Sequence, residues 1–118
     1  MKQLAMYING LFENDFNGEW RDVLNPSTEE TSAREPKGGK ADVDRAVAAA
    51  RAAQPAWERL PAVERGAYSR RIAQGIHERA DELTHTIVAE SGQTKDSARV
   101  EVLFTADSDA YQTASARR

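Results

Sequence analysis

The 118-residue sequence contains no cysteine. This absence excludes disulfide bonds, and it removes the side chain whose thiolate acts as a nucleophile near neutral pH. A long apolar run is also missing, since none approaches the roughly 20 residues that span a bilayer. The N-terminus lacks the apolar core of a signal peptide. From these absences we expect a cytoplasmic chain with no membrane partner.

An excess of positive charge is missing as well. The chain carries 16 Lys and Arg against 19 Asp and Glu, a net charge of −3, with acids and bases interspersed. This pattern provides no basic surface for nucleic acid, so we expect no nucleic-acid partner. Apolar residues make up 40% of the chain, and many are alanines, which bury little area each. We therefore expect one compact unit with a modest core.

Residues 1–36 carry the signals for turns and strands. Asn9-Gly10 lies between apolar pairs, which is a strong hairpin pattern. Glu19 to Leu24 is a second candidate strand, ended by Asn25-Pro26 because proline cannot donate to a sheet. Thr28 to Arg34 could be the returning strand, on a weaker pattern. Residues 1–36 are thus predicted to form a β-hairpin and strand arm.

Residues 37–118 are predicted to be helical. Apolar residues repeat at helical spacing after residue 40, and Pro55 should end this first helix near Ala53 or Gln54. A second helix is predicted over 61–90, with a break near His77–Arg79 left open, and a third from near Asp96 toward Arg118. Ser91-Gly92 is a candidate helix C-cap. The predicted fold class is α+β, mainly α, with three to four helices and a small N-terminal antiparallel β element.

The central packing is predicted from the apolar stripe of the 61–90 helix. Its members follow steps of four, four, three and four residues, which places them on one helix face. We expect this stripe to meet the large apolar residues of the first and last helices. The two sets are Ile72, Ile76, Ala80, Leu83 and Ile87 on the stripe, and Val43, Val47, Val100, Leu103 and Phe104 on its partners.

Several segments form a pattern whose order and spacing extend across nearly the whole chain. They are Met6-Tyr7-Ile8-Asn9-Gly10, Val23 to Glu30, Asp42 to Arg51, Trp57, Pro61 to Arg65 and Ile72 to Leu83. Together they resemble the N-terminal part of an aldehyde dehydrogenase of the lactaldehyde or glycolaldehyde type.

The resemblance implies a parent enzyme that oxidises an aldehyde with NAD(P) through a cysteine thiolate. In that family the cysteine, the general-base glutamate and the dinucleotide-binding strands lie further along the chain. We therefore assign no catalytic residue, no cofactor-binding residue and no cofactor to this chain, and expect that it is not an enzyme by itself. Gly38-Gly39 follows no strand that the pattern clearly predicts, so it is not read as a phosphate loop.

The resemblance also implies one candidate metal site. Glu101 matches an acidic residue that helps to hold a monovalent cation in some relatives, where backbone carbonyls matching Val23 and Leu24 complete part of the shell. The alternative for Glu101 is a carboxylate on a helix surface. His77 and His85 lie about two turns apart and show no third ligand, so surface histidines are favoured over a metal pair.

Polar residues occupy several positions where the family usually has apolar or small ones. Because they could lie on faces that the rest of an enzyme covers, they suggest a segment resurfaced or designed as an autonomous, structural domain. The alternative is an interaction module that docks on the remaining enzyme domains, on another partner, or on itself. The positions are Thr31, Ser32, Glu35, Ser69, Gln74, Ser108, Asp109, Gln112 and Ser115.

Overall fold

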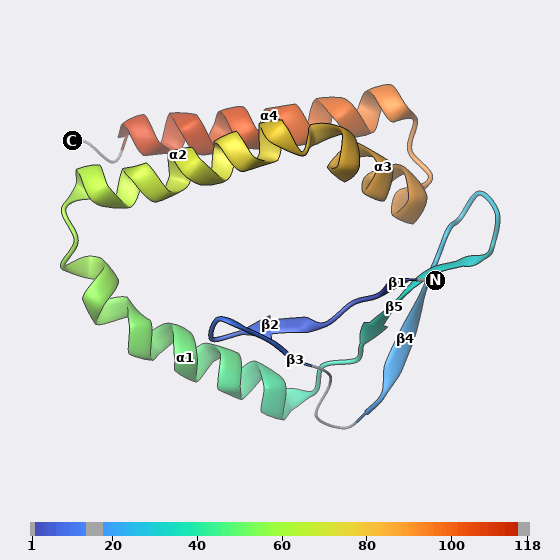
Figure 1. Ribbon diagram of the computed structural model, residues 1–118, viewed down its shortest axis with the longest axis horizontal. Coiled ribbons are helices and arrows are strands. Elements are labelled where there is room, and N and C mark those ends of the chain that lie inside the picture. Colours follow the sequence, from blue (N-terminus) through green and yellow to red (C-terminus); the bar gives the residue numbers. More distant parts are fainter. Residues whose placement is uncertain (1, 14–17, 116–118) are drawn as a thin grey trace. The chain divides into compact units, whose positions relative to one another are not determined.

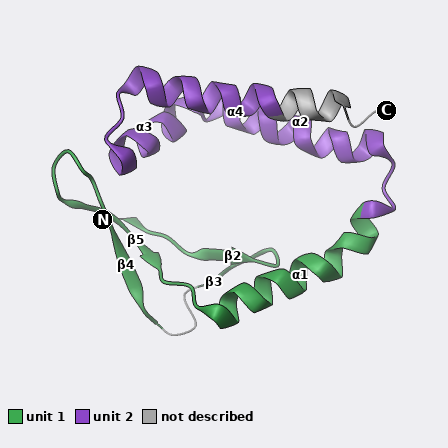
Figure 2. Cartoon of the chain, turned by 180° about the vertical axis from the view of Figure 1, so that it is seen from behind, with its two compact units in different colours: residues 1–57 green, residues 58–118 purple. Residues whose placement is uncertain are grey.

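The computed structural model describes residues 2–13 and 18–115, with side chains described as far as Ser108. The chain divides into two compact units, residues 1–57 and 58–118 (Figure 2). Within the described residues there are five short strands and four helices (Figure 1). The predicted α+β class, mainly α, is therefore confirmed. The packing of the whole chain as one compact unit, with an arm that ends at residue 36, stays a prediction.

The N-terminal hairpin forms as predicted. Strand β2 (Met6–Ile8) pairs antiparallel with β3 (Leu11–Glu13), and Ile8 lies opposite Leu11. Asn9 and Gly10 in the turn have φ values of 52° and 82°. Two positive φ angles are typical of the tight turn that matches the twist of a hairpin, and asparagine and glycine reach them at low cost.

A second sheet has the order β1-β5-β4. Strand β4 (Trp20–Leu24) pairs antiparallel with β5 (Thr31–Pro36), which confirms the returning strand. Strand β1 (Lys2–Gln3) pairs parallel with β5 and was not predicted, because two residues are too short to show a pattern. Polar β5 is explained by its neighbours: Ser32 Oγ donates to the Val23 carbonyl at 2.9 Å, and Glu35 pairs with Arg21.

Helix α1 (Lys40–Glu58) corrects the prediction that Pro55 ends the first helix. Proline lacks a backbone N–H and disturbs the preceding turn, but here the helix continues for three residues beyond it. Continuation keeps Trp57 at helical spacing from Val47 and Ala50, and these side chains line one groove along α1.

The second half of the chain forms α2 (Ala62–Glu78), α3 (Ala80–Ser91) and α4 (Lys95–Ser115). The break near His77–Arg79 is confirmed, since Arg79 leaves helical geometry with φ −108° and ψ 17°. The predicted C-cap is also confirmed. Gly92 is left-handed, with φ 70°, and its N–H donates to the Val88 carbonyl at 3.0 Å.

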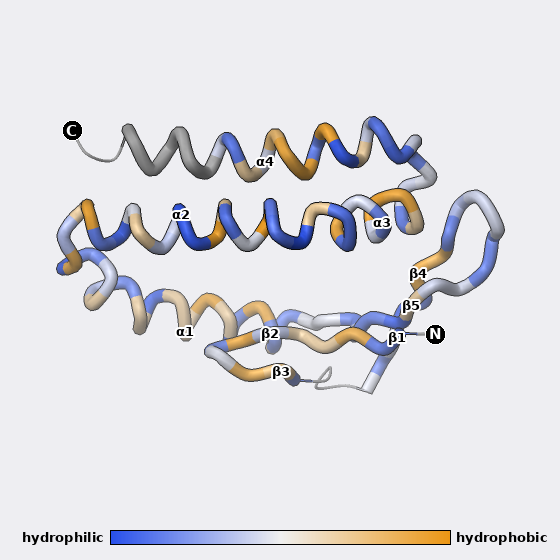
Figure 3. Tube along the Cα trace, turned by 45° about the horizontal axis from the view of Figure 1, so that its top comes forward, coloured by the Kyte–Doolittle hydropathy of each residue, from blue (hydrophilic) through white to orange (hydrophobic). Residues whose placement is uncertain are grey.

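The packing of unit 2 differs from the prediction. The seam between its helices is made of small side chains, and Ala98 and Ala106 on α4 are 0% exposed. Val100 and Phe104 are 66% and 71% exposed instead, because a step of two residues turns a side chain to the opposite side of a helix. Apolar and polar positions alternate along these helices (Figure 3). Up to Ser108, where the described side chains end, the buried residues of unit 2 are Gly66, Ala73, Ala80, Thr84, Ala98, Val102 and Ala106.

Small side chains explain why alanines are buried in unit 2 while larger residues are exposed. Glycine and alanine on facing helices let the backbones approach closely, so that dispersion contacts replace the burial of large groups. The stripe of larger residues in α2 and α3 is consequently only partly buried: Ile72 is exposed, while Ile76 and Leu83 are half-buried. The predicted core was wrong for Ile72, Val100 and Phe104, which are exposed, and right for Ala80, which is 6% exposed.

Candidate interaction surface and predicted cation ligands

Unit 2 exposes large apolar side chains and also has a groove. The exposed residues are Val63, Tyr68 and Ile72 on α2, and Val100 and Phe104 on α4. Large apolar side chains exposed in such number are typical of surfaces that another protein part covers. The groove has a volume of about 340 Å³ and is open to solvent. Its lining, mostly apolar, is Ile76, Leu83, Thr86, Ile87, Glu101, Val102 and Thr105.

Unit 1 has its own exposed apolar residues. Tyr7, Leu11 and Phe12 project from the hairpin, and the rings of Tyr7 and Phe12 lie 4.9 Å apart, centroid to centroid. Along α1 a groove of about 480 Å³ runs past Val47 and Trp57. Each unit therefore exposes several large apolar side chains. We use the name apolar docking faces for the exposed apolar residues of both units together with the unit 2 groove.

The predicted cation ligands fall in different units. Val23 and Leu24 lie on β4, where the Val23 carbonyl already accepts the Ser32 hydroxyl. Glu101 is exposed on α4, and its carboxylate oxygens accept from Gln93 Nε2 at 3.4 and 3.5 Å. No group of three or more His, Asp or Glu side chains within the described ranges is arranged to hold a metal ion. The monovalent-cation site therefore stays a prediction.

The two histidines lie on helix surfaces. His77 Nε2 is 3.3 Å from a carboxylate oxygen of Asp107, and both side chains are exposed. His85 is exposed on α3. Neither arrangement places a second imidazole beside the first, so the alternative of surface histidines is the one the geometry favours.

Gly38-Gly39 has a setting that the sequence analysis misjudged. Strand β5 ends at Pro36 and α1 begins at Lys40, so the two glycines do connect a strand to a helix. The Gly39 N–H, however, donates to Asp42 Oδ2 at 2.9 Å. That donor is already engaged within the chain, so the pair still gives no sign of a phosphate loop.

Charge pairs on the surface shift three pKa values. The Arg99 guanidinium donates a hydrogen bond to Asp81 and, with its charge, lowers the pKa of that carboxyl. Hydrogen bonds to Asp42 and Glu13 raise the pKa of Arg45, and a hydrogen bond to Glu82 raises that of Arg79. These shifts stabilise the charged forms and supply neither an acid nor a base poised near neutral pH.

Comparison with known proteins identifies what the chain is part of. A sequence model of the aldehyde dehydrogenase family matches residues 13–118. The chain belongs to the aldehyde dehydrogenase family. It is 47% identical over 116 residues to lactaldehyde dehydrogenase of Escherichia coli, covering 98% of this chain and 24% of that protein. The crystal structure of the E. coli enzyme superimposes with a TM-score of 0.95 at 46% identity, with the same coverage.

Other members of the aldehyde dehydrogenase family match at lower identity. A 3,6-anhydro-α-L-galactose dehydrogenase of a Vibrio species is 37% identical over 93 residues, covering 79% of this chain and 19% of that protein. An NAD-dependent aldehyde dehydrogenase of Sinorhizobium meliloti has a TM-score of 0.92 at 30% identity, covering 97% and 24%. The chain thus spans about a quarter of the length of the relatives it matches. The nicotinamide cofactor that the resemblance implied for the family agrees with the S. meliloti enzyme.

Among the residues that the structure describes, no helix is both long and apolar enough to cross a membrane. The sequence analysis missed two features of the site. Small residues mark the inward faces of both helices: Gly66 and Ala73 on α2 are seven residues apart, and Ala98 and Ala106 on α4 are eight apart. The sequence prediction gave more weight to the larger residues. The link from Glu13 to Arg45 joins residues far apart in sequence, and no local pattern indicates it.

Proposed function

We propose that this chain is a structural N-terminal segment of an NAD(P)-dependent aldehyde dehydrogenase and docks on the remaining enzyme through its apolar docking faces. The observation that carries the proposal is the inverted burial of unit 2, with alanines inside and Val100 and Phe104 outside. Such a surface gains stability when a partner removes it from water, at roughly 25 cal/mol per Å² of apolar area.

The chain by itself is proposed to be non-catalytic. Aldehyde oxidation of the kind that the family resemblance implies needs a thiolate nucleophile, and the chain has no cysteine. The whole enzyme would take the hydride from the substrate to the nicotinamide and release an acid. The 47% identity to lactaldehyde dehydrogenase makes a small hydroxyaldehyde such as lactaldehyde the first substrate to test. The cytoplasmic location and the absence of a nucleic-acid partner stay predictions.

A resurfaced autonomous domain is the second candidate. Polar residues in β5 and exposed Gln74, which donates to Glu78 at 2.7 Å, favour it. In a domain resurfaced to fold alone, exposed large apolar residues should also have been replaced by polar ones. Val63, Ile72 and Phe104 are nevertheless exposed in this chain. The predicted polar replacements at Asp109, Gln112 and Ser115 concern side chains outside the described residues. We therefore favour docking.

Fragment complementation tests the proposal. The 118-residue chain is mixed with the E. coli lactaldehyde dehydrogenase piece that begins after the matched segment, and lactaldehyde-dependent NAD⁺ reduction is measured. Docking predicts turnover from the mixture and none from either piece. A paired Ile72→Ser and Phe104→Ser variant should weaken the recovery, while Lys40→Gln, an exposed change elsewhere, should leave it unchanged. Turnover by the chain alone, or no association of the two pieces, would contradict docking.

A further inference from the structure

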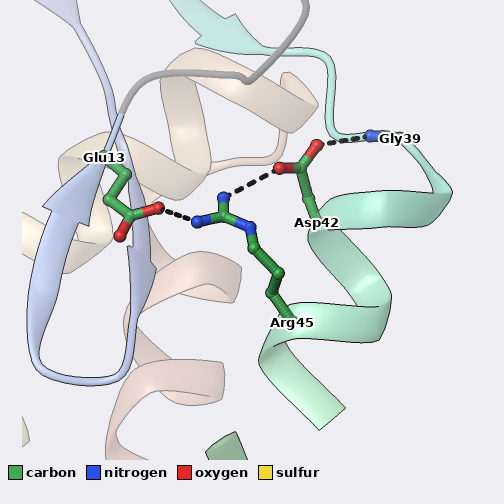
Figure 4. Close-up of polar contacts among 4 residues, drawn as sticks. All are labelled: Glu13, Gly39, Asp42 and Arg45. Carbon is green, nitrogen blue, oxygen red and sulfur yellow. Dashed lines mark hydrogen bonds and ion pairs between the residues drawn. The ribbon is translucent and has the colours of Figure 1, made fainter. Parts of the chain in front are cut away.

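One guanidinium joins the N-terminal hairpin to the start of α1. Arg45 Nη1 donates to Glu13 Oε2 on β3 at 2.6 Å, and Arg45 Nη2 donates to Asp42 Oδ1 at 2.9 Å (Figure 4). Glu13 and Arg45 are 32 residues apart in sequence. The planar fork of arginine allows it to hold two carboxylates at once, which a lysine ammonium does less well.

The carboxylate of Asp42 is at the same time part of the helix start. Asp42 is 3% exposed, and its second oxygen, Oδ2, accepts the Gly39 N–H at 2.9 Å. A carboxylate in the first turn also interacts favourably with the helix dipole. The hairpin is thus connected through Arg45 to Asp42 in the first turn of α1.

Few apolar side chains of the hairpin and α1 are buried beside this polar connection. The hairpin residues Tyr7 to Gly10 and the α1 alanines, from Ala46 to Ala53, line an open groove of about 300 Å³. Ile8 is the buried residue of the described hairpin strands. An isolated two-stranded hairpin is at best marginally stable in water, and alanine methyls give it few contacts.

We propose that Arg45 is an electrostatic clamp that fixes the β2–β3 hairpin on the start of α1 and so presents Tyr7 and Phe12, which pair on one hairpin face, as one apolar surface. The clamp itself is independent of what the surface binds. Use of that surface for docking rests on the proposed function. Failure of complementation would therefore leave the clamp standing, since the clamp is measured on the chain alone.

Hydrogen exchange of the backbone amides tests the clamp. In Arg45→Gln, exchange of the β2 and β3 amides should rise about three- to tenfold, while the amides of unit 2 keep their rates. Arg45→Lys retains the charge without the fork and should give an intermediate increase. The matched control is Lys40→Gln, which removes a cation of α1 that pairs with Asp44 at 2.5 Å and has no link to the hairpin. It should leave hairpin exchange unchanged.

A second variant distinguishes loss of the clamp from general unfolding of α1. Glu13→Gln alters the hairpin side of the clamp and leaves the Asp42–Gly39 contact in place, so helical content should persist while hairpin exchange rises. In the double variant the increases should be less than additive, because both changes break one interaction. Unchanged hairpin exchange in both single variants would overturn the proposal. An equal increase in Lys40→Gln, or an equal increase throughout unit 2, would overturn it as well.

Discussion

Each of the two units is stabilised internally by a different kind of interaction. Unit 1 combines short strands with ion pairs that connect neighbouring segments, including Arg34 with Asp22 and Arg45 with Glu13. Unit 2 is a helical seam of small side chains, with its ion pairs on the outside. Exposed ion pairs contribute little individually, whereas a close-packed seam tolerates almost no change in volume. The helical unit should therefore be the more sensitive of the two to side-chain size.

The largest effect should come from adding bulk to the seam. Ala98→Leu places three extra carbons at a position that is 0% exposed, and overpacking of this kind costs about 1–3 kcal/mol. The matched control is Val100→Leu on the same helix, where exposure should keep the change within about 0.5 kcal/mol. Urea unfolding of both variants measures the difference. Equal stability of the two would show that α4 does not use its alanine face for packing.

The next largest effects come from replacing a glycine in each unit, and they should have opposite signs in the two units. Gly10→Ala meets no heavy atom within 4 Å, so its cost of about 1–2 kcal/mol comes from the positive φ alone and falls on the hairpin. Gly75→Ala also meets nothing within 4 Å, but it lies inside α2 and should stabilise unit 2 by about 0.5–1 kcal/mol. Thermal unfolding and hairpin amide exchange measure both. Stabilisation by Gly10→Ala would refute the turn argument.

Local backbone geometry could be predicted from the sequence, whereas the packing between helices could not. Asn9-Gly10 and Gly92 determine local backbone geometry, so the hairpin and the helix C-cap were predicted correctly. The faces of α2 and α4 depend on which partner each helix meets, and both small and large stripes are compatible with a helix. The prediction that α1 ends before Pro55 was wrong, since the helix continues to Glu58 and the local rule about proline does not determine its end. The predicted cation ligands lie in two different units, and the site that they would form stays a prediction.

The smallest effect concerns the charge pairs of unit 2. The pKa of Asp81 is lowered in the folded chain, so its contribution to stability is present above the ordinary carboxyl pKa. That contribution is lost as pH falls through the lowered folded pKa. In Arg99→Gln the pKa of Asp81 should return upward toward its ordinary value, and the pH dependence of stability in that acidic window should flatten. Titration of the Asp81 carboxyl by NMR measures the shift. An unchanged pKa would show that the Arg99 contact is not maintained in solution.

The central claim is that the chain exposes apolar faces which another part of an enzyme covers. Light scattering coupled to size exclusion, over a series of concentrations of the 118-residue chain, tests this claim directly. We predict that the average mass rises with concentration, and that the paired Ile72→Ser and Phe104→Ser variant remains closer to the monomer mass. A chain that stays monomeric at every concentration, with the variant indistinguishable from it, would contradict the account and favour a domain resurfaced to exist alone.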